Sequence, residues 1–131
     1  MFVFRIDSRS GVPPYLQLVQ QVQQSVLLGF LRHGDRLPLI REVSESLAIN
    51  PNTVAKAYRQ LEQEGLVTGR PGQGTFVNEA PTAGMSAATY TSLRRGLETW
   101  LKKAHSAGLD EQAVTALFTA VVNRAKNENI A

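Results

Sequence analysis

The chain has 131 residues, of which 43% are hydrophobic and 19% are charged, with a net charge of +3 and no cysteine. This length allows one domain with a short appendage, and the apolar content excludes a disordered chain. Because the chain has no cysteine, disulfide scaffolds, thiolate nucleophiles and cysteine zinc sites are excluded. The longest apolar run, Val26 to Leu31, is far shorter than the ~18 residues that span a membrane, and Met1 to Asp7 lacks the pattern of a signal peptide, so we expect a cytoplasmic protein.

The N-terminal region predicts a short strand followed by a helix. Apolar residues stand at alternate positions from Phe2 to Ile6, which is typical of a strand. From Tyr15 onward they recur at steps of three and four, and we expect this amphipathic helix to continue as far as Gly34. The glutamines between positions 17 and 24 lie between these apolar residues, so we expect them to form a solvated face.

Two closely spaced helices and a hairpin come next. Residues 40–47 predict a second helix, and Asn50 with the following proline predicts the start of a third, which ends before Gly65. Short strands at 66–68 and 75–77 then flank a glycine-rich turn. This order of elements is that of a helix-turn-helix that carries a β-wing.

A stretch of small and polar residues separates this region from a second one with helical periodicity. It contains Pro81 and Gly84 and is typical of a linker. We therefore expect a mainly α fold, a winged helix-turn-helix followed by a two-helix dimerisation tail. The expected organisation is a DNA-binding domain at 1–78, a linker at 79–88 and the tail at 89–131.

The exposed face of the predicted third helix, residues 51–64, has the composition of a DNA-reading surface. Its first half places Asn52, Thr53, Lys56 and Arg59 opposite the apolar stripe, and no acidic residue precedes Glu62. Short amide and hydroxyl groups can reach base edges in the major groove, and Lys and Arg bind phosphates or guanine. The alternative interpretation is an ordinary solvated helix face, which the neighbouring turn and wing make less attractive.

Arg41 and the glycine-rich turn offer further contacts to DNA. Arg41, in the first turn of the second helix, either contacts phosphate or guanine or pairs with Glu45 four residues later. The turn from Arg70 to Thr75 contains Gly72 and Gly74, which would let the hairpin tip lie against a sugar-phosphate backbone with Arg70 at the minor groove. The alternative is an ordinary hairpin that needs glycine for its turn. A strand rather than a helix follows the turn, so a mononucleotide phosphate loop is not expected.

Three segments, 34–43, 50–67 and 72–77, strongly resemble the GntR family of bacterial winged-helix transcription regulators, and residues 4–7 and 14–17 add to the match. The short tail is similar to the Ytr-type branch, in which a two-helix appendage replaces a large effector domain. The resemblance implies repression, with control of a neighbouring transporter operon. It also implies DNA contacts by the arginine after the Leu-Pro pair, by the recognition helix and by the wing: Arg41, Asn52, Thr53, Lys56, Arg59, Gly72 and Gly74. Leu39 departs from the family pattern, which has a capping Ser or Thr there, and Ala48 departs where glycine is common.

The tail predicts two helices, the first ending at Gly108 and the second capped by Asp110. Two helices of this size cannot enclose wide apolar stripes by themselves, and a two-fold partner is the most frequent solution. We therefore expect a homodimer whose half-sites on the DNA lie about 10 bp or a multiple apart. The expected interface residues are Leu93, Leu97, Trp100, Leu101, Leu117, Phe118 and Val121. The alternative is that the tail folds back on the winged helix of its own chain.

Other classes of function find less support. His33 and His105 lie in separate regions, and no acid is matched with a nucleophile, so we expect no enzyme, no metal site and no cofactor. A winged helix used only for protein–protein contact would favour apolar or acidic residues on the third helix. The expected partners are therefore double-stranded operator DNA and a second copy of the chain. Regulation is expected from a small molecule at the dimer seam or from protein concentration alone.

Overall fold

The computed structural model describes the backbone of residues 2–79 and 85–130 and the side chains of 2–79 and 85–128. The chain divides into two compact units, Met1–Ala87 and Ala88–Ala131, which we call the N-terminal and C-terminal units. Half of the linker expected at 79–88, residues 80–84 with its proline and glycine, lies outside the described residues. Its last two residues, Ala87 and Ala88, begin the first helix of the tail.

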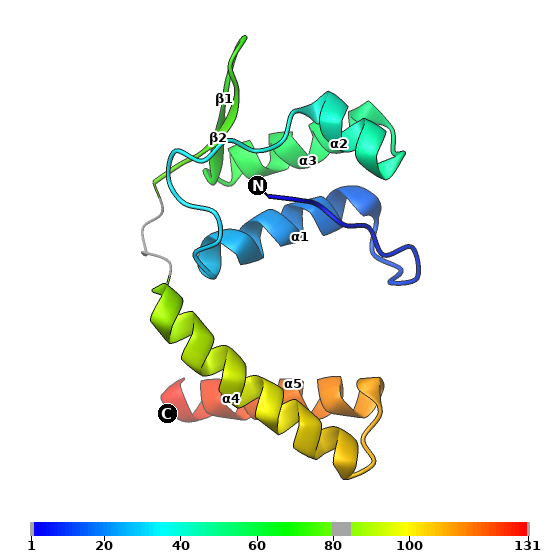
Figure 1. Cartoon of the computed structure of the whole chain (residues 1–131), viewed down its shortest axis with the longest axis vertical. Coiled ribbons are helices and arrows are strands. Elements are labelled where there is room, and N and C mark those ends of the chain that lie inside the picture. The colour runs from blue at the N-terminus through cyan, green and yellow to red at the C-terminus, as the bar shows by residue number, and fades with distance from the viewer. Residues whose placement is uncertain (1, 80–84, 131) are drawn as a thin grey trace. The chain divides into compact units, whose positions relative to one another are not determined.

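Three helices and a small antiparallel sheet form the N-terminal unit (Figure 1). In chain order they are α1 Pro14–Leu27, α2 Ile40–Leu47, α3 Pro51–Gln63, β1 Val67–Arg70 and β2 Gly74–Val77. α3 packs against α1, α2 and β1, and it is therefore the central element of the unit. The two strands project as a narrow wing beyond the helices. This arrangement confirms the predicted winged helix-turn-helix.

The prediction of a strand at the N-terminus is wrong. The segment from Phe2 to Ile6 is extended but pairs with no strand within the described residues. Two glutamines of α1 satisfy its backbone instead: Gln21 accepts from the Arg5 N–H at 2.9 Å and donates to its carbonyl at 2.6 Å. Gln17 bonds the Asp7 N–H and carbonyl in the same way, at 2.8 and 2.9 Å. Gln17 is consequently buried, with 8% of its surface exposed, which corrects the expected solvated glutamine face at this position.

The first helix is shorter than expected, ending at Leu27 rather than continuing to Gly34. Gly29 adopts a left-handed conformation, with φ of 82°. The Phe30 N–H donates to the Ser25 carbonyl at 2.8 Å and the Gly29 N–H to the Val26 carbonyl at 3.2 Å. These two bonds form a Schellman motif, which closes a helix once a residue without a side chain takes the left-handed position. Phe30 therefore leaves the apolar stripe and is exposed.

α2 begins at Ile40 although Leu39 has no capping oxygen. The Glu42 carboxylate accepts a hydrogen bond from the Leu39 N–H at 3.4 Å, which supplies the acidic half of a capping box. At the other end, Ala48 has φ of 54°, and the Ile49 N–H donates to the Ser44 carbonyl at 3.2 Å. Ala48 thus takes the left-handed position that glycine occupies with less strain. The turn between α2 and α3 is thus made without glycine, despite the departure at Ala48.

A single apolar core joins these elements. The stripe expected on α3 is confirmed, since Val54, Ala57, Tyr58 and Leu61 are all buried. Residues from the N-terminal segment, α1, the segment before α2, α2 itself and both wing strands complete the core: Phe4, Leu18, Val19, Val22, Leu31, Leu37, Val43, Val67 and Val77. The recognition-helix candidate is therefore fixed along its whole inner face.

The C-terminal unit is a helical hairpin of α4, Ala87–Ser106, and α5, Glu111–Ile130. Gly108, with φ of 94°, ends the first helix as expected. The Asp110 carboxylate accepts from the Ala113 N–H at 2.8 Å and caps the second. The rings of Trp100 and Phe118 lie 6.4 Å apart between their centroids.

Candidate nucleic-acid interface

The start of α3 is built as the sequence predicted. Pro51 occupies the first helical position, and the Asn50 side chain accepts from the Asn52 N–H at 2.8 Å. This cap satisfies one of the free backbone N–H groups at the helix N-terminus, the end that carries the partial positive charge of the helix and where Asn52 is exposed. Thr53 is half-buried, so it offers a smaller part of its surface than the sequence pattern suggested.

Lys56 and Arg59 are exposed on the outer side of α3, opposite the buried stripe. Lys56 also makes a contact that the sequence did not predict: its Nζ lies 3.9 Å from the centroid of the Tyr15 ring on α1. A cation over an aromatic face is attracted by the ring quadrupole, with about 0.5–1 kcal/mol at an exposed site. This contact therefore favours a position of the Lys56 ammonium between α1 and α3.

Arg41 makes the ion pair that the sequence offered as one of two interpretations. Its Nε lies 3.7 Å from Oε1 of Glu45 on the next turn of α2. The two side chains are 90% and 74% exposed, and exposed pairs of this kind contribute only ~0–1 kcal/mol. The pair can therefore be exchanged for a phosphate or a base at little cost, and its presence leaves Arg41 available as a ligand for DNA.

The wing has the register Val67↔Val77, Thr68↔Phe76, Gly69↔Thr75 and Arg70↔Gly74. At the tip, Gly72 has φ of 75° with open space around it, so backbone conformation alone requires glycine there. Arg70 is exposed, and its guanidinium carbon lies 4.7 Å from the centroid of the Phe76 ring. Thr75 is half-buried at the inner end of the turn.

A third short segment pairs with the wing, which the sequence analysis missed. Arg36 forms an antiparallel bridge with Phe76. The Leu37 N–H donates to the Thr75 carbonyl, and the Val77 N–H donates to the Asp35 carbonyl, both at 2.8 Å. The local sequence does not predict that residues 35–37 pair like a strand, because this pairing depends on β2, about forty positions later in the chain. The base of the wing is thus tied to the segment that leads into α2.

Tyr58 anchors this same segment from the recognition helix. Its hydroxyl donates to the Pro38 carbonyl. Burial raises the pKa of the Tyr58 phenol far above its ordinary value, and the nearby Glu42 carboxylate raises it further. The neutral hydroxyl therefore fixes the distance between α3 and the start of α2, the two elements that carry Asn52 and Arg41.

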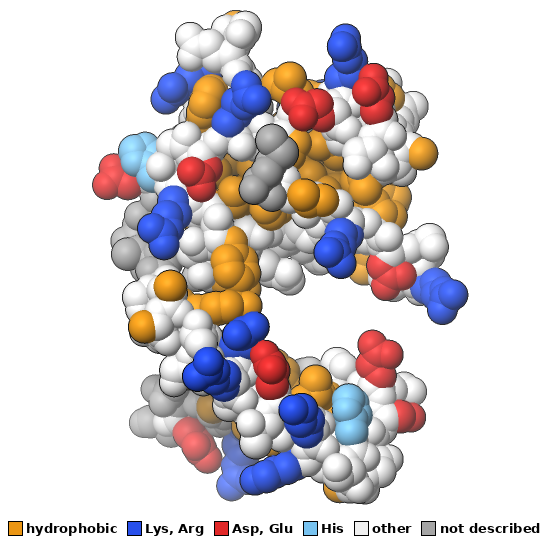
Figure 2. Space-filling view, viewed as in Figure 1, with side chains coloured by type: hydrophobic (Ala, Val, Ile, Leu, Met, Phe, Trp, Pro, Cys, Tyr) orange, Lys and Arg blue, Asp and Glu red, His pale blue; other side chains and the backbone are white. Residues whose placement is uncertain are grey.

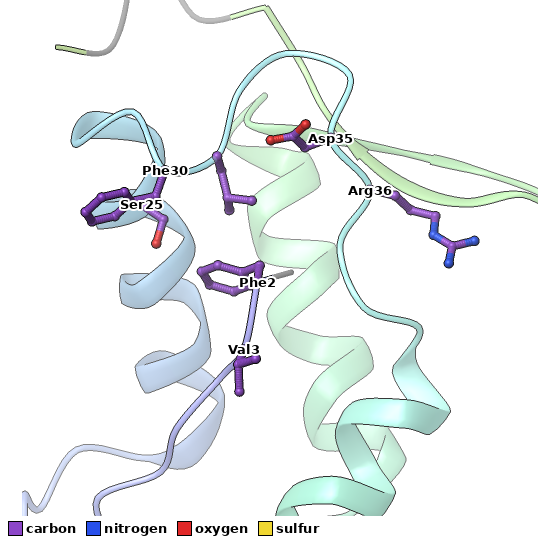
Figure 3. Close-up of a pocket in the computed structure, with 7 residues that line it drawn as sticks. Phe2, Val3, Ser25, Phe30, Asp35 and Arg36 are labelled. Carbon is purple, nitrogen blue, oxygen red and sulfur yellow. The ribbon is translucent and has the colours of Figure 1, made fainter. Parts of the chain in front are cut away.

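A separate hollow of about 550 Å³ opens beside the N-terminal segment (Figure 3). It is lined by Phe2, Val3, Ser25, Phe30, Leu31, Asp35 and Arg36. Figure 3 shows the rings of Phe2 and Phe30 on one side and the Arg36 side chain directed away from them. Part of the exposed apolar area in Figure 2 lies over the N-terminal segment.

Metal and membrane sites find no support in the part of the chain that is described. Residues 2–79 and 85–130 bring together no group of three His, Cys, Asp or Glu side chains able to hold a metal ion. In the same residues, no helix is both long and apolar enough to cross a bilayer.

The tail residues expected at a dimer interface are mostly exposed in the single chain. Leu93 is 60% exposed, Leu97 51% and Val121 58%, whereas Trp100 is half-buried against Phe118. Leu101, Leu117 and Phe118 are exposed as well. The structure thus shows an apolar surface on both helices of the hairpin.

Comparison with known proteins agrees with this architecture. The family model of bacterial regulatory proteins, gntR family, matches residues 14–77. The HTH-type transcriptional repressor YtrA of Bacillus subtilis (strain 168) is 36% identical over 108 residues, which are 82% of this chain and 83% of that protein.

Two solved structures extend the likeness to the tail. A transcriptional antiterminator from Listeria monocytogenes EGD-e has a TM-score of 0.60 at 28% identity, over 92% of this chain and 90% of its own. YtrA from Sulfolobus acidocaldarius, a GntR-family transcription factor, has a TM-score of 0.54 at 28% identity, over 80% of this chain and 99% of its own. Transcription regulation is not an enzymatic class. The chain belongs to the gntR family of bacterial regulatory proteins and is a DNA-binding transcription regulator.

Proposed function

We propose that this regulator is a repressor that binds an inverted-repeat operator as a homodimer, with α3 in the major groove and the wing at the minor groove. The observation that carries the proposal is the outer face of α3. Asn52, Lys56 and Arg59 are exposed there, the Asn50 side chain caps the helix N-terminus, and the first acid on the helix is Glu62. A face that offers amide and cationic groups without acids suits base edges and phosphates, whereas a protein-binding surface would favour apolar or acidic groups.

The proposed contacts divide into base-reading and backbone-positioning residues. Asn52, at the exposed start of α3, and Arg41, whose surface ion pair is weak, are assigned to base edges. Thr53, Lys56 and Arg59 follow Asn52 along the same helix, and we assign them to the groove wall and the phosphates. Arg70, Gly72, Gly74 and Thr75 are assigned to the wing contact. Repression follows the printed function of the Bacillus subtilis relative.

The apolar surface of the tail supports the homodimer. Among the side chains described in the C-terminal unit, Ala104 is the one buried hydrophobic residue, while large apolar side chains on both helices face solvent. A two-fold partner would cover this surface and would place two copies of α3 on successive half-sites, about 10 bp or a multiple apart. A small-molecule effector at this seam stays a prediction.

Binding to a duplex from the chain's own upstream region tests the proposal. Against a scrambled duplex of equal length, Asn52→Ala and Arg41→Ala should each lose about 1–3 kcal/mol of affinity for the upstream duplex alone. Arg59→Ala should weaken binding to both duplexes equally and reduce its salt dependence. If the first two variants keep the preference of the unmodified chain, the assignment of the base-reading residues is wrong. If the unmodified chain prefers neither duplex and all retention disappears at moderate salt, specific binding to this region is refuted.

A further inference from the structure

The bridge between Arg36 and Phe76 places an arginine on one face of the wing. In antiparallel pairs, directly opposed residues project their side chains to the same face of the sheet. The hydrogen bonds on either side, Leu37 N–H to Thr75 and Val77 N–H to Asp35, make this a non-hydrogen-bonded pair, in which side chains approach most closely. The Arg36 side chain therefore lies on the face that Phe76 defines.

Arg70 is brought to the same face by the register of the hairpin. Phe76 and Gly74 are two positions apart on β2 and point the same way, and Arg70 pairs with Gly74. The contact of the Arg70 guanidinium with the Phe76 ring, at 4.7 Å, agrees with this placement. Arg36 and Arg70, although distant in the sequence, thus lie on the same face of the wing and of the segment that pairs with it.

Gly74 provides the room for Arg36 on this face. A Cβ at Gly74 would lie 3.1 Å from Cδ and 3.4 Å from Cγ of Arg36, closer than ordinary van der Waals contact. The stem of Arg36 consequently crosses the sheet where β2 has no side chain. Gly74 is required there by close approach as well as by its φ of 125°.

The Arg36 guanidinium is left available at the end of this stem. It is exposed, and the described residues give it no hydrogen bond and no ion pair. It borders an open hollow of about 660 Å³ that the wing turn from Gly69 to Thr75 also lines. Glu62 is the acid on this hollow, and its Oε2 already accepts from the Gly69 N–H at 2.9 Å. Lys and Arg side chains flank the base of the wing on the face shown in Figure 2.

We propose that Arg36 and Arg70 together bind a backbone phosphate of the DNA on this face of the wing, a contact in which Arg36 crosses Gly74 to reach the ligand. An exposed guanidinium suits a phosphate because its planar donors match the oxygen geometry and can bind two oxygens at once. The contact rests on the proposed DNA binding and adds to it a source of affinity that does not depend on base sequence. The pairing of the segment before α2 with the wing keeps Arg36 on the face that also carries Arg70, and both residues line the same hollow.

The experiment compares Arg36→Gln and Arg36→Lys in the full chain, because both keep an aliphatic stem over Gly74 and only lysine keeps the charge. The probe is a random-sequence duplex of about 30 bp, roughly three helical turns, and anisotropy is followed from about 50 to 200 mM salt. Arg36→Gln should weaken binding about three- to tenfold and lower the slope of log affinity against log salt by about 0.9 for each protomer bound. Arg36→Lys should restore most of that slope, which a merely structural role of the stem would not do.

Arg32→Gln is the matched control, since it removes the same charge from an exposed arginine four residues earlier in the same loop. Its effect on affinity should stay below about twofold, because long-range attraction between exposed charges is screened at these salt concentrations. Equal curves for Arg36→Gln and Arg32→Gln, alongside a loss of operator preference in Asn52→Ala, would overturn the wing contact and leave the proposed function standing. Failure of the unmodified chain to bind any duplex would overturn both.

Discussion

The N-terminal unit encloses its apolar side chains, whereas the C-terminal unit presents them to solvent. Leu18, Leu37 and Leu61 have no exposed surface in the first unit. In the second, Leu93 and Val121 are more than half exposed, and Ala104 is the one buried hydrophobic side chain among those described. Two helices and a wing can surround a central helix, but the two helices of a hairpin contact each other along one line only. The difference indicates that the first unit has a complete core within one chain, whereas the second leaves an apolar surface that the proposed homodimer would cover.

The architecture of the first unit also explains its chemistry. α3 is held along one side by α1, α2 and β1, so the opposite side is free to carry polar and cationic groups. Rigid support matters because base-edge hydrogen bonds tolerate little displacement of the reading side chains. In the proposed homodimer, the tail would bring in the second copy that an inverted repeat requires, and the two units would have separate roles in one function.

The largest effect is expected from truncating the core of the N-terminal unit. Leu18→Ala removes a fully buried side chain and should lower the free energy of unfolding by about 2–5 kcal/mol, through lost burial and the cavity that remains. Urea denaturation followed by circular dichroism measures this loss, which should not change with protein concentration. Leu27→Ala on the same helix is the control: its side chain is 66% exposed, and a change within about 0.5 kcal/mol is expected. Equal losses in both variants would contradict the difference in burial.

A charge in the tail should break association while leaving the N-terminal unit folded. Leu97→Asp places a carboxylate on the exposed apolar surface, and burying it in a dimer should cost about 2–4 kcal/mol, roughly a 30- to 800-fold rise in the dimer dissociation constant. Sedimentation equilibrium measures that constant, and Trp100→Asp should likewise yield monomers. Thr99→Asp introduces the same charge on another side of α4 and should leave the dimer intact. Dimers of unchanged affinity in Leu97→Asp and Trp100→Asp would move the interface elsewhere.

A smaller effect is expected where Tyr58 joins α3 to the segment before α2. Tyr58→Phe removes the hydrogen bond to the Pro38 carbonyl and should cost about 1 kcal/mol at neutral pH. The folded-state pKa of Tyr58 is raised by burial and by Glu42. Above pH ~10, the ordinary pKa of tyrosine, the unfolded chain therefore releases a proton that the folded chain keeps, and stability falls as pH rises.

Phenylalanine lacks this ionisation, so the stability difference between the two proteins should shrink as the pH is raised from about 9 to 11. Denaturation at several pH values measures the difference. A gap that stays constant over this interval would show that the Tyr58 phenol ionises as easily in the folded protein as in the unfolded chain, and would refute its burial.

Local signals in the sequence predicted most of the helical framework. The periodicity of α3, its cap at Asn50 and the glycines at 65 and 108 depend on neighbours within one or two turns, so they can be identified without a fold. The same reasoning fails for the end of α1. Gly29 and Gly34 both have positive φ, and the sequence does not say which of them closes the helix.

The sequence by itself thus determined the order of the helices and the wing, the polar face of α3 and the apolar tail, since each is a pattern of spacing along one segment. Only the tertiary structure decided that glutamines of α1 replace a partner strand, that Lys56 lies over Tyr15, and that Arg36 crosses Gly74 on the wing. These contacts join residues that lie between 10 positions (Asp7 and Gln17) and 41 positions (Tyr15 and Lys56) apart. Such pairings depend on how whole elements pack, and no local propensity encodes them.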